Sequence, residues 1–202
     1  MRPITPAKKH HHGNLRPALI KAGLELLEEG GIDALTLRKC AARAGVSHAA
    51  PAHHFDGLPG LKQAIAVEAF QLFSNHLQGA IDSGEQTPRG RLKSICRGYL
   101  QFGLSHRGLL NVIFGFDGLA ALANPEGQDE AHAYLILRSV CAPFVPDGTD
   151  ARIIEAQVWS LIHGFTLLYI AGEFGSPPEP IETGPFDQVM ALLDRIGTEP
   201  SA

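Results

Sequence analysis

The side chains whose types could do chemistry are concentrated in one stretch of twenty residues, from Thr36 to Phe55. This stretch holds hydroxyl, imidazole, guanidinium and ammonium groups, which donate hydrogen bonds to base edges and to phosphate oxygens. Alanines lie between these donors, and short side chains would let a backbone sit deep in a major groove. The residues of interest are Thr36, Arg38, Lys39, Arg43, Ser47, His48, Ala49, Ala52 and His53, with Lys62 a little further along the chain. They could bind DNA if the fold holds them on one surface.

Two short helices joined by a sharp turn would hold the residues in this way. Thr36 is a good N-cap, and Gly45 can end the first helix because glycine tolerates a positive φ. Ser47 can cap a second helix that runs to about His54, with Pro51 in or just beyond its first turn. The apolar residues of the first helix recur at helical spacing: Leu37, Cys40, Ala41 and Ala44. The spacing fits a helix-turn-helix, and it fits equally well a helical hairpin of the kind found in bundles.

The segment from Leu15 to about Leu61 resembles the N-terminal signature of the TetR family of transcriptional regulators, in an AcrR-like form. The residues at the signature positions are Thr36, Leu37, Ala41, Ala44, Gly45, Val46, Ser47, His54, Phe55 and Leu61. The preceding apolar stripe is similar to the first helix of that family: Leu15, Leu19, Ala22, Leu26 and Leu27. The resemblance implies an all-α fold of about nine helices, in which a three-helix DNA-binding domain precedes a helical ligand-binding and dimerisation domain.

Two positions depart from the family pattern. Ala52 stands where the family usually has an aromatic residue, and Leu58 stands where it usually has a lysine. Both family residues tend to contact the phosphate backbone, which supplies much of the affinity for DNA of any sequence. Thr36, at a helix N-terminus, and the nearby basic residues could replace those contacts. A second hypothesis therefore remains, namely a helical ligand-binding or adaptor protein whose helix-turn-helix is degenerate.

Charge is divided unevenly along the chain. The net charge is −4, but residues 1–60 carry eight Lys and Arg residues against five acidic residues, which leaves −7 for the remainder. A basic N-terminal domain would turn toward a polyanion. His10, His11 and His12 follow Lys8 and Lys9 in a leader that we interpret as an arm lying along DNA. A purification tag and a metal chelator are the other interpretations, and no metal site is predicted because adjacent histidines in a tail have no fixed geometry.

Length and composition suit a small N-terminal domain and a larger second one, because 45% of the 202 residues are apolar. We expect a leader over 1–12, a DNA-binding domain over 13–60, a ligand-binding and dimerisation domain over 61–197 and a tail over 198–202. The longest apolar run, 158–172, is predicted to be too short to span a membrane, and no signal peptide is recognised, so we expect a cytoplasmic protein. Cys40, Cys96 and Cys141 have no pairing pattern and are predicted to be reduced core thiols.

The second domain is predicted to contain helices over about 61–81, 88–105, 107–114, 126–142, 150–171 and 185–196, separated by clusters of Gly, Pro and Asp. Several glycines interrupt these helices. They could mark close helix contacts, room for a ligand, or mobility.

The last two helices carry wide apolar faces. On the final one, Phe186, Val189, Met190, Leu193 and Ile196 form a stripe that a monomer would have to hide. The stripe predicts either a homodimer interface or part of the core of this chain. A dimer is favoured because one short reading helix covers few base pairs, so two related helices normally occupy a two-fold symmetric operator. The last pair of helices is also similar to the four-helix dimer interface of TetR proteins.

A ligand pocket is implied by the resemblance. Trp159, His163 and Gly164 resemble the Trp-His-Gly signature of one C-terminal subgroup. The candidate ligand-binding residues are Phe102, His106, Phe114, Tyr134, Trp159 and His163. For each of them a place in the core is the alternative, because an aromatic residue at helical spacing is usually buried in one.

Nothing in the chain assembles a reaction or a cofactor site. Ser160 and His163 lie one turn apart, but no acidic residue or oxyanion turn accompanies them, and no phosphate-binding or dinucleotide motif occurs. We therefore predict a non-enzymatic regulator without a cofactor. It is expected to bind double-stranded operator DNA as a homodimer and to be released by a small-molecule effector.

Overall fold

The chain is helical throughout the residues that the structure, a computed structural model, describes: 15–115, 130–174 and 185–197. The helices are α1 (Leu15–Ala34), α2 (Leu37–Arg43), η1 (Ala50–His53), α3 (Gly57–Ser83), α4 (Pro88–Ser105), α5 (Arg107–Phe114), α7 (Glu130–Cys141), η2 (Ala142–Phe144), α8 (Ala151–Ile170), α9 (Pro185–Met190) and η3 (Ala191–Arg195), where η marks a 3₁₀ helix. The predicted all-α class is confirmed. The expected leader, the expected tail and the residues 116–129 and 175–184 lie outside the described ranges.

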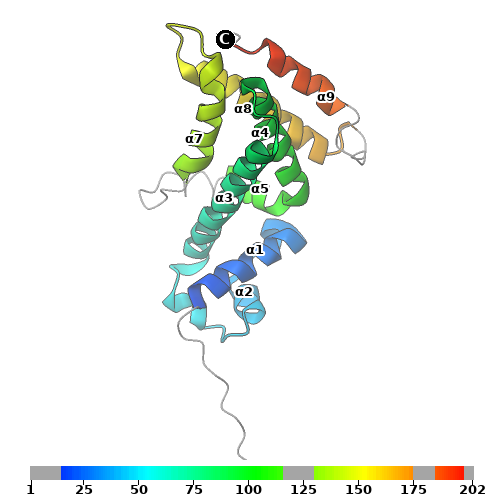
Figure 1. Cartoon of the computed structure of the whole chain (residues 1–202). Helices are drawn as coiled ribbons and strands as arrows, with labels where there is room; N and C mark the ends of the chain where they lie inside the picture. Colours follow the sequence, from blue (N-terminus) through cyan, green and yellow to red (C-terminus); the bar gives the residue numbers. More distant parts are fainter. Residues whose placement is uncertain (1–14, 116–129, 175–184, 198–202) are drawn as a thin grey trace, which may run out of the picture.

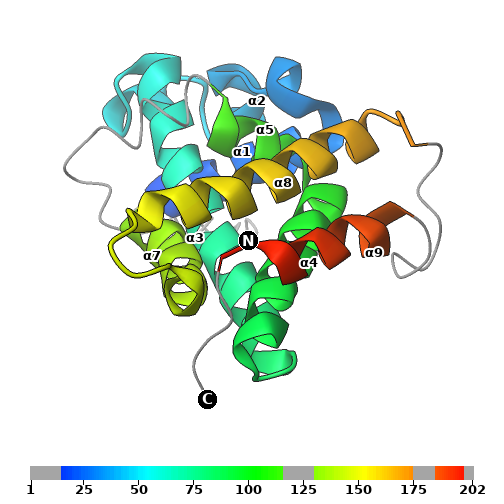
Figure 2. The same ribbon diagram turned by 90° about the horizontal axis from the view of Figure 1, so that it is seen from above.

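The helices form a small head and a larger body joined by α3 (Figure 1). The head consists of α1, α2 and η1 at one end of the molecule, and the body consists of α4 to η3 around the other half of α3. Viewed from above, α8 crosses the body, with α7 at one end and α9 beside α4 (Figure 2). One continuous hydrophobic core runs from Leu19 in the head to Leu193 in the body. The head is therefore packed on the body rather than tethered to it.

Helix boundaries agree with the sequence where local signals define them. The helices Pro88–Ser105 and Arg107–Phe114 have the predicted bounds. Thr87 caps the first of these, since its hydroxyl oxygen accepts a hydrogen bond from the N–H of Gly90 at 3.0 Å. The long helix differs: it begins at Gly57 rather than near Leu61, because Pro59 lies in its first turn, where a missing N–H costs little. The domain boundary that we expected at residue 60 therefore falls inside a continuous helix.

Close helix contacts explain two of the glycines in the body. A Cβ atom on Gly103 would lie 2.6 Å from Cγ2 of Thr166, so this glycine lets α4 approach α8. A Cβ atom on Gly108 would lie 2.2 Å from the backbone oxygen of Leu27, so this glycine lets α5 approach α1 in the head. Of the three interpretations that the sequence left open, close contact applies at these two positions.

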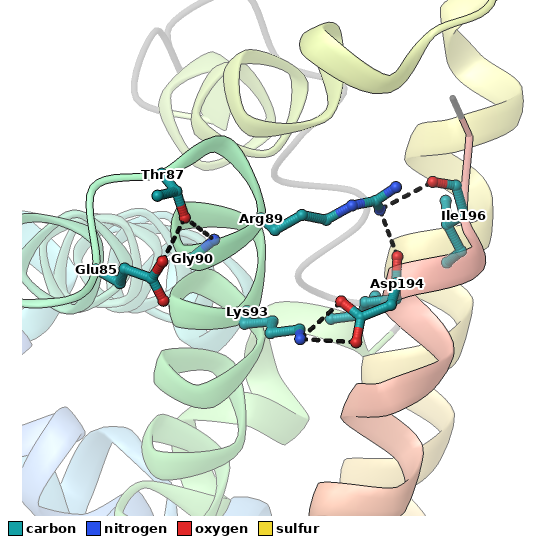
Figure 3. Close-up of polar contacts among 8 residues, drawn as sticks. Glu85, Thr87, Arg89, Gly90, Lys93, Asp194 and Ile196 are labelled. Carbon is teal, nitrogen blue, oxygen red and sulfur yellow. Dashed lines mark hydrogen bonds and ion pairs between the residues drawn. The ribbon is translucent and has the colours of Figure 1, made fainter. Parts of the chain in front are cut away.

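The C-terminal helix is fastened to the start of α4 by charged side chains (Figure 3). Arg89 donates hydrogen bonds to the backbone oxygens of Leu193 and Ile196, the second at 2.9 Å. Lys93 forms an ion pair with Asp194 at 2.7 Å. These contacts reach carbonyl groups at the end of η3, and the Leu193 oxygen also accepts a hydrogen bond from the N–H of Ile196 at 3.2 Å. The predicted helix 185–196 is thus observed as α9 followed by the 3₁₀ helix η3.

In the described part of the chain, α8 with Ala171 is the one helix long and apolar enough to cross a membrane by length and composition. The apolar run 158–172 is the second part of this longer helix, which extends back to Ala151. Its face with Ile154, Val158 and Ile162 is buried in the body.

The three cysteines are buried and unpaired, as predicted. Burial raises the pKa of the Cys40 thiol and raises the pKa of Cys141 to about 12. Such thiols are poor nucleophiles and poor redox sensors.

Candidate nucleic-acid interface and ligand-binding region

The first half of the helix-turn-helix is built as its sequence predicts. The Thr36 hydroxyl oxygen accepts a hydrogen bond from the N–H of Lys39 at 3.2 Å and caps α2. Gly45 follows the helix with a φ of +70°, which few other residues adopt. The N–H of Val46 then bonds back to the oxygen of Ala41 at 3.0 Å, which closes a Schellman motif. The turn is therefore determined by local sequence.

The second half differs from the prediction. The expected helix from Ser47 to His54 is wrong, because only Ala50–His53 is helical and it is a 3₁₀ helix. Ser47 does not cap it: the N-cap position is Ala49, and no side chain bonds there. The ring of Pro51 is buried under this turn and has no N–H to donate, so an α-helix cannot begin earlier and continue through it. The reading element is therefore a single tight turn.

The predicted DNA-binding residues come mainly from α2, from the turn after it and from η1, which lie at the end of the head away from the body (Figure 1). Seven of these residues are exposed: Arg38, Lys39, Ser47, His48, Ala49, Ala52 and His53. Thr36 and Lys62 are partly buried. We call the seven exposed residues the head surface. It combines two cations, a hydroxyl and two imidazoles with small side chains between them, which suits contact with a DNA groove and its phosphates.

Arg43 is a correction to the predicted DNA contacts. Its guanidinium forms two hydrogen bonds with the carboxylate of Glu29, one of them at 2.7 Å, and lies 3.5 Å from Glu25. Both acids belong to α1. The hydrogen bonds from Arg43 lower the pKa of Glu29. These contacts engage both terminal nitrogens of the guanidinium and fasten α2 to α1.

Charge in the described part of the head is balanced. Residues 15–60 contain five basic and five acidic side chains. The basic excess of the N-terminal region therefore comes from Arg2, Lys8 and Lys9, which lie outside the described residues. The same ranges, 15–115, 130–174 and 185–197, contain no group of three His, Cys, Asp or Glu side chains that could hold a metal ion.

Three of the six candidate ligand residues meet in the body. The ring of Phe114 lies 5.9 Å from that of Trp159 and 4.9 Å from that of His163. Tyr99, which the sequence analysis did not select, joins them: its hydroxyl lies 2.7 Å from Nδ1 of His163. No signal in the sequence links Tyr99 on α4 to His163 on α8, because the two residues are 64 positions apart. We call these four residues the aromatic site.

The other three candidates lie elsewhere. Phe102 is 1% exposed and packs against Phe73, so it belongs to the core. Tyr134 on α7 is 42% exposed and donates a hydrogen bond to the buried carboxylate of Glu155. These two residues therefore lie apart from the other candidates, and their side chains make other contacts.

His106, the remaining candidate, lies at the joint between head and body. Its Nδ1 is 2.8 Å from the carboxylate of Glu28 on α1. The close approach of Gly108 to the backbone of Leu27 lies two residues further on, at the start of α5. The α4–α5 corner therefore touches the head through a hydrogen bond and through a backbone contact. A shift of this corner would move α1.

Three of the five predicted dimer residues are buried in the core of the chain itself. Phe186, Met190 and Leu193 are 2%, 5% and 0% exposed, because α9 and η3 fold back onto α4 and α8. They are corrections, since a side chain that is already covered cannot contact a second copy. Val189 and Ile196 are partly buried.

An apolar surface remains uncovered next to these helices. A groove of about 720 Å³ runs between α8 and η3, and its lining includes Ile153, Gln157, Leu161, Leu192 and Ile196. Ile153 is 50% exposed and Leu192 is 46% exposed. We call this the α8–η3 groove. Large apolar side chains gathered on one exposed face often mark an interface with another protein.

Comparison with known protein families gives two matches that together span most of the chain. Residues 19–61 match the family described as bacterial regulatory proteins, tetR family, and residues 92–193 match the tetracycline repressor-like C-terminal domain. An uncharacterised helix-turn-helix-type transcriptional regulator of Mycobacterium tuberculosis is 24% identical over 165 residues, which cover 78% of this chain and 71% of that protein.

Solved structures show the same fold. A protein of unknown function from Rhodococcus sp. RHA1 superposes with a TM-score of 0.72 and 26% identity, over 95% of this chain and 100% of that one. The transcriptional regulator FadR of Bacillus subtilis, solved in complex with stearoyl-CoA, superposes with a TM-score of 0.61 and 16% identity, over 88% and 96% of the two chains.

Proposed function

The chain belongs to the TetR family of transcription regulators, and from this we propose that it is a repressor that binds operator DNA as a homodimer and leaves it when a small molecule binds the body. The observation that carries the proposal is the head surface, on which cations, imidazoles and small side chains are exposed together at the tip of the molecule. Such a protein would act where DNA is, so we place it in the cytoplasm.

The shape of the reading element supports binding as a dimer. A single 3₁₀ turn, Ala50–His53, can contact few base pairs. Two copies related by a two-fold axis would read two half-sites, separated by about one or more turns of the DNA helix. The operator is therefore proposed to be two-fold symmetric.

The α8–η3 groove is the surface that we propose for dimerisation. In a two-fold dimer the same patch meets its copy, so apolar side chains there become covered in both protomers. Replacing Ile153 or Leu192 with Glu would bury a charge at this contact, and we expect each variant to sediment as a monomer. Leu72 on α3 is also exposed, at 41%, and Leu72→Glu is the matched control. Dimers that survive both groove substitutions would contradict this interface.

The joint at His106 supports the proposed release by a ligand. The FadR complex shows that a protein of this fold can hold a small molecule. A ligand bound in the body would displace α4 and α5, and the contacts of His106 with Glu28 and of Gly108 with Leu27 would pass the movement to α1. The ligand must bind the DNA-incompetent arrangement more tightly, because equal affinity for both arrangements shifts nothing.

Binding to DNA is tested by titrating the protein against a labelled fragment of its own promoter at two salt concentrations, with unrelated DNA as competitor. Specific binding that weakens with salt is expected. Arg38→Ala and His53→Ala should each weaken it, and the arginine variant should lower the salt slope by about one. Arg97 is an exposed arginine of α4 in the body, so Arg97→Ala should leave binding unchanged. Unchanged binding in both head variants would mean that DNA binds another surface.

A second candidate function is a helical ligand-binding or adaptor protein with a degenerate head. Two observations favour it. The reading element is shorter than an α-helical one, and Leu58, which replaces a family lysine, packs against the hydrophobic core instead of facing DNA. Absence of promoter binding, or binding that does not depend on salt, would support this alternative over the repressor.

A further inference from the structure

The aromatic site is an open arrangement rather than a sealed part of the core. Trp159 is 40% exposed, and Phe114 and His163 are partly exposed, whereas Tyr99 beneath them is 5% exposed. Edge and face contacts of 4.9 to 6.0 Å hold the rings together. The site therefore has a buried base and an accessible rim of aromatic faces.

Hydrogen bonding determines which nitrogen of His163 carries the proton. The hydroxyl of Tyr99 is buried, and Nδ1 of His163, 2.7 Å away, is the polar atom that it contacts among the described residues. The hydroxyl proton of Tyr99 can therefore be donated to this nitrogen. If Nδ1 carried a proton instead, the buried hydroxyl of Tyr99 would have no acceptor, which is costly. Nδ1 is therefore the acceptor, and Nε2 of His163 bears the N–H.

The surroundings of this imidazole also favour its neutral form. Burial lowers the pKa of His163, and no charged group contributes to the shift. A neutral N–H donor pairs well with a neutral acceptor such as a carbonyl oxygen. A carboxylate at the same place would lose water without gaining a counter-charge, which costs more than the hydrogen bond returns.

We propose that the aromatic site binds a flat, uncharged aromatic compound that bears a carbonyl oxygen, with its ring against Phe114 and Trp159 and its oxygen accepting a hydrogen bond from Nε2 of His163. Ring stacking supplies affinity, and the single N–H supplies selection for the carbonyl group. The inference rests on the proposed function only where it identifies this compound class as the effector. Binding itself can be measured without DNA.

Three naphthalene probes separate the contributions. The first is 2-acetylnaphthalene, the second is 2-isopropenylnaphthalene, a hydrocarbon of similar shape without an acceptor, and the third is naphthalene-2-carboxylate. Affinities are measured by calorimetry on the full-length protein, and Trp159 reports the location because it is the one tryptophan of the chain. We expect the ketone to bind roughly tenfold more tightly than the hydrocarbon, to bind more tightly than the carboxylate, and to change the Trp159 fluorescence saturably.

His163→Phe keeps a ring and removes the donor. It should abolish the preference for the ketone while changing the affinity for the hydrocarbon by no more than about twofold. His132→Phe, at an exposed position on α7, is the control and should keep the preference. Equal binding of ketone and hydrocarbon by the natural protein, a preference that survives His163→Phe, or no saturable binding of any probe would each overturn the proposal.

Tyr99 acts in this site as a positioning residue. Tyr99→Phe keeps the packing of the ring against Phe73, 5.2 Å away, but leaves Nδ1 of His163 without its donor. We expect ¹⁵N NMR of the His163 ring, identified by its absence in His163→Phe, to show protonation at Nε2 in the natural protein and a mixture of tautomers in Tyr99→Phe. Protonation at Nδ1 in the natural protein would overturn the assignment. A protein that binds the ketone but no promoter DNA would refute the repressor and leave this site standing.

Discussion

Two histidines of the larger domain, His76 and His163, have surroundings that lower their pKa and favour the neutral ring. Burial is the main cause that lowers the pKa of His76 below its ordinary value of 6.5, and His106 nearby contributes to the same shift. Its Nε2 is buried without a hydrogen-bond partner in the described part of the chain. A protonated ring at this position would hold an unsatisfied charge, so the folded state resists protonation.

This resistance predicts a loss of stability in mild acid. Below the ordinary histidine pKa the unfolded chain takes up a proton that folded His76 does not, so the free energy of unfolding falls as the pH falls through this window. Above the ordinary histidine pKa, His76 is neutral in both the folded and the unfolded chain, and this loss of stability is absent. Urea unfolding at pH 7.5 and 5.5 should show the loss, and His76→Leu should reduce it. His132→Leu, at an exposed histidine, should not, and an equal pH dependence in all three proteins would contradict the prediction.

Between elements, backbone contact at glycine determines how closely the head and body pack. At Gly108 a Cβ atom would lie 2.2 Å from a backbone oxygen of α1, which cannot move away as a side chain could. Gly108→Ala should therefore lower the free energy of unfolding by about 1–3 kcal/mol and disturb the joint.

The matched control is Gly79 near the end of α3. It is exposed, and a Cβ atom there would meet nothing within 4 Å. Gly79→Ala should stabilise the protein by about 0.5–1 kcal/mol, because alanine loses less entropy in a helix. Thermal unfolding of both variants checks the pair, and destabilisation of equal size in the two would show that helix propensity, not the head–body contact, is responsible.

Docking of the C-terminal helix depends on Arg89. Its guanidinium lies 4.0 Å from the centre of the Phe144 ring while it donates to the carbonyls at the end of η3. Arg89→Met keeps the apolar contact and removes the donors, and it should weaken docking by about 1.5–3 kcal/mol. Amide hydrogen exchange of residues 185–197 should accelerate accordingly.

Lys93 supplies the control for Arg89. Its ion pair with Asp194 is exposed, and pairs of this kind contribute little. Lys93→Met should therefore change the exchange of the same residues much less than Arg89→Met does. The opposite order would mean that the ion pair holds the helix in place.

Over the whole molecule, the net basic charge of residues 1–60 comes from the first twelve residues of the sequence. The described head is balanced, and its Arg43 is committed to Glu29, so the excess comes from three cations of residues 1–12. Replacing Arg2, Lys8 and Lys9 with Gln should lower the salt slope of promoter binding by about 2 to 3. Replacing His10, His11 and His12 with Ala at pH 8 should leave the slope unchanged. An unchanged slope in the first variant would show that the leader does not touch DNA.

Local chemistry made a large part of this protein predictable from its sequence. Neighbouring residues in the sequence determine the cap at Thr36, the positive φ at Gly45 and the bounds Pro88–Ser105. These features could therefore be predicted without knowledge of the tertiary structure. The same signals misled at Ser47, where a capping residue precedes Pro51, because a proline buried in a 3₁₀ turn does not look different in sequence from one in the first turn of an α-helix.

Partners distant in sequence were decided by the tertiary structure alone. The sequence predicts Arg43 as a DNA contact, but α1 places Glu29 beside it. The sequence predicts Phe186 as an interface residue, but it is buried where α9 packs on the body. Tyr99 has no mark in the sequence at all, yet it orients His163 from another helix. Periodicity shows that a helix has an apolar or charged face, but what covers that face is determined by the packing of helices across the whole chain. The sequence by itself therefore determined the helices, the turn and the family, and only the fold decided which side chains remain available for DNA, a ligand or a second copy.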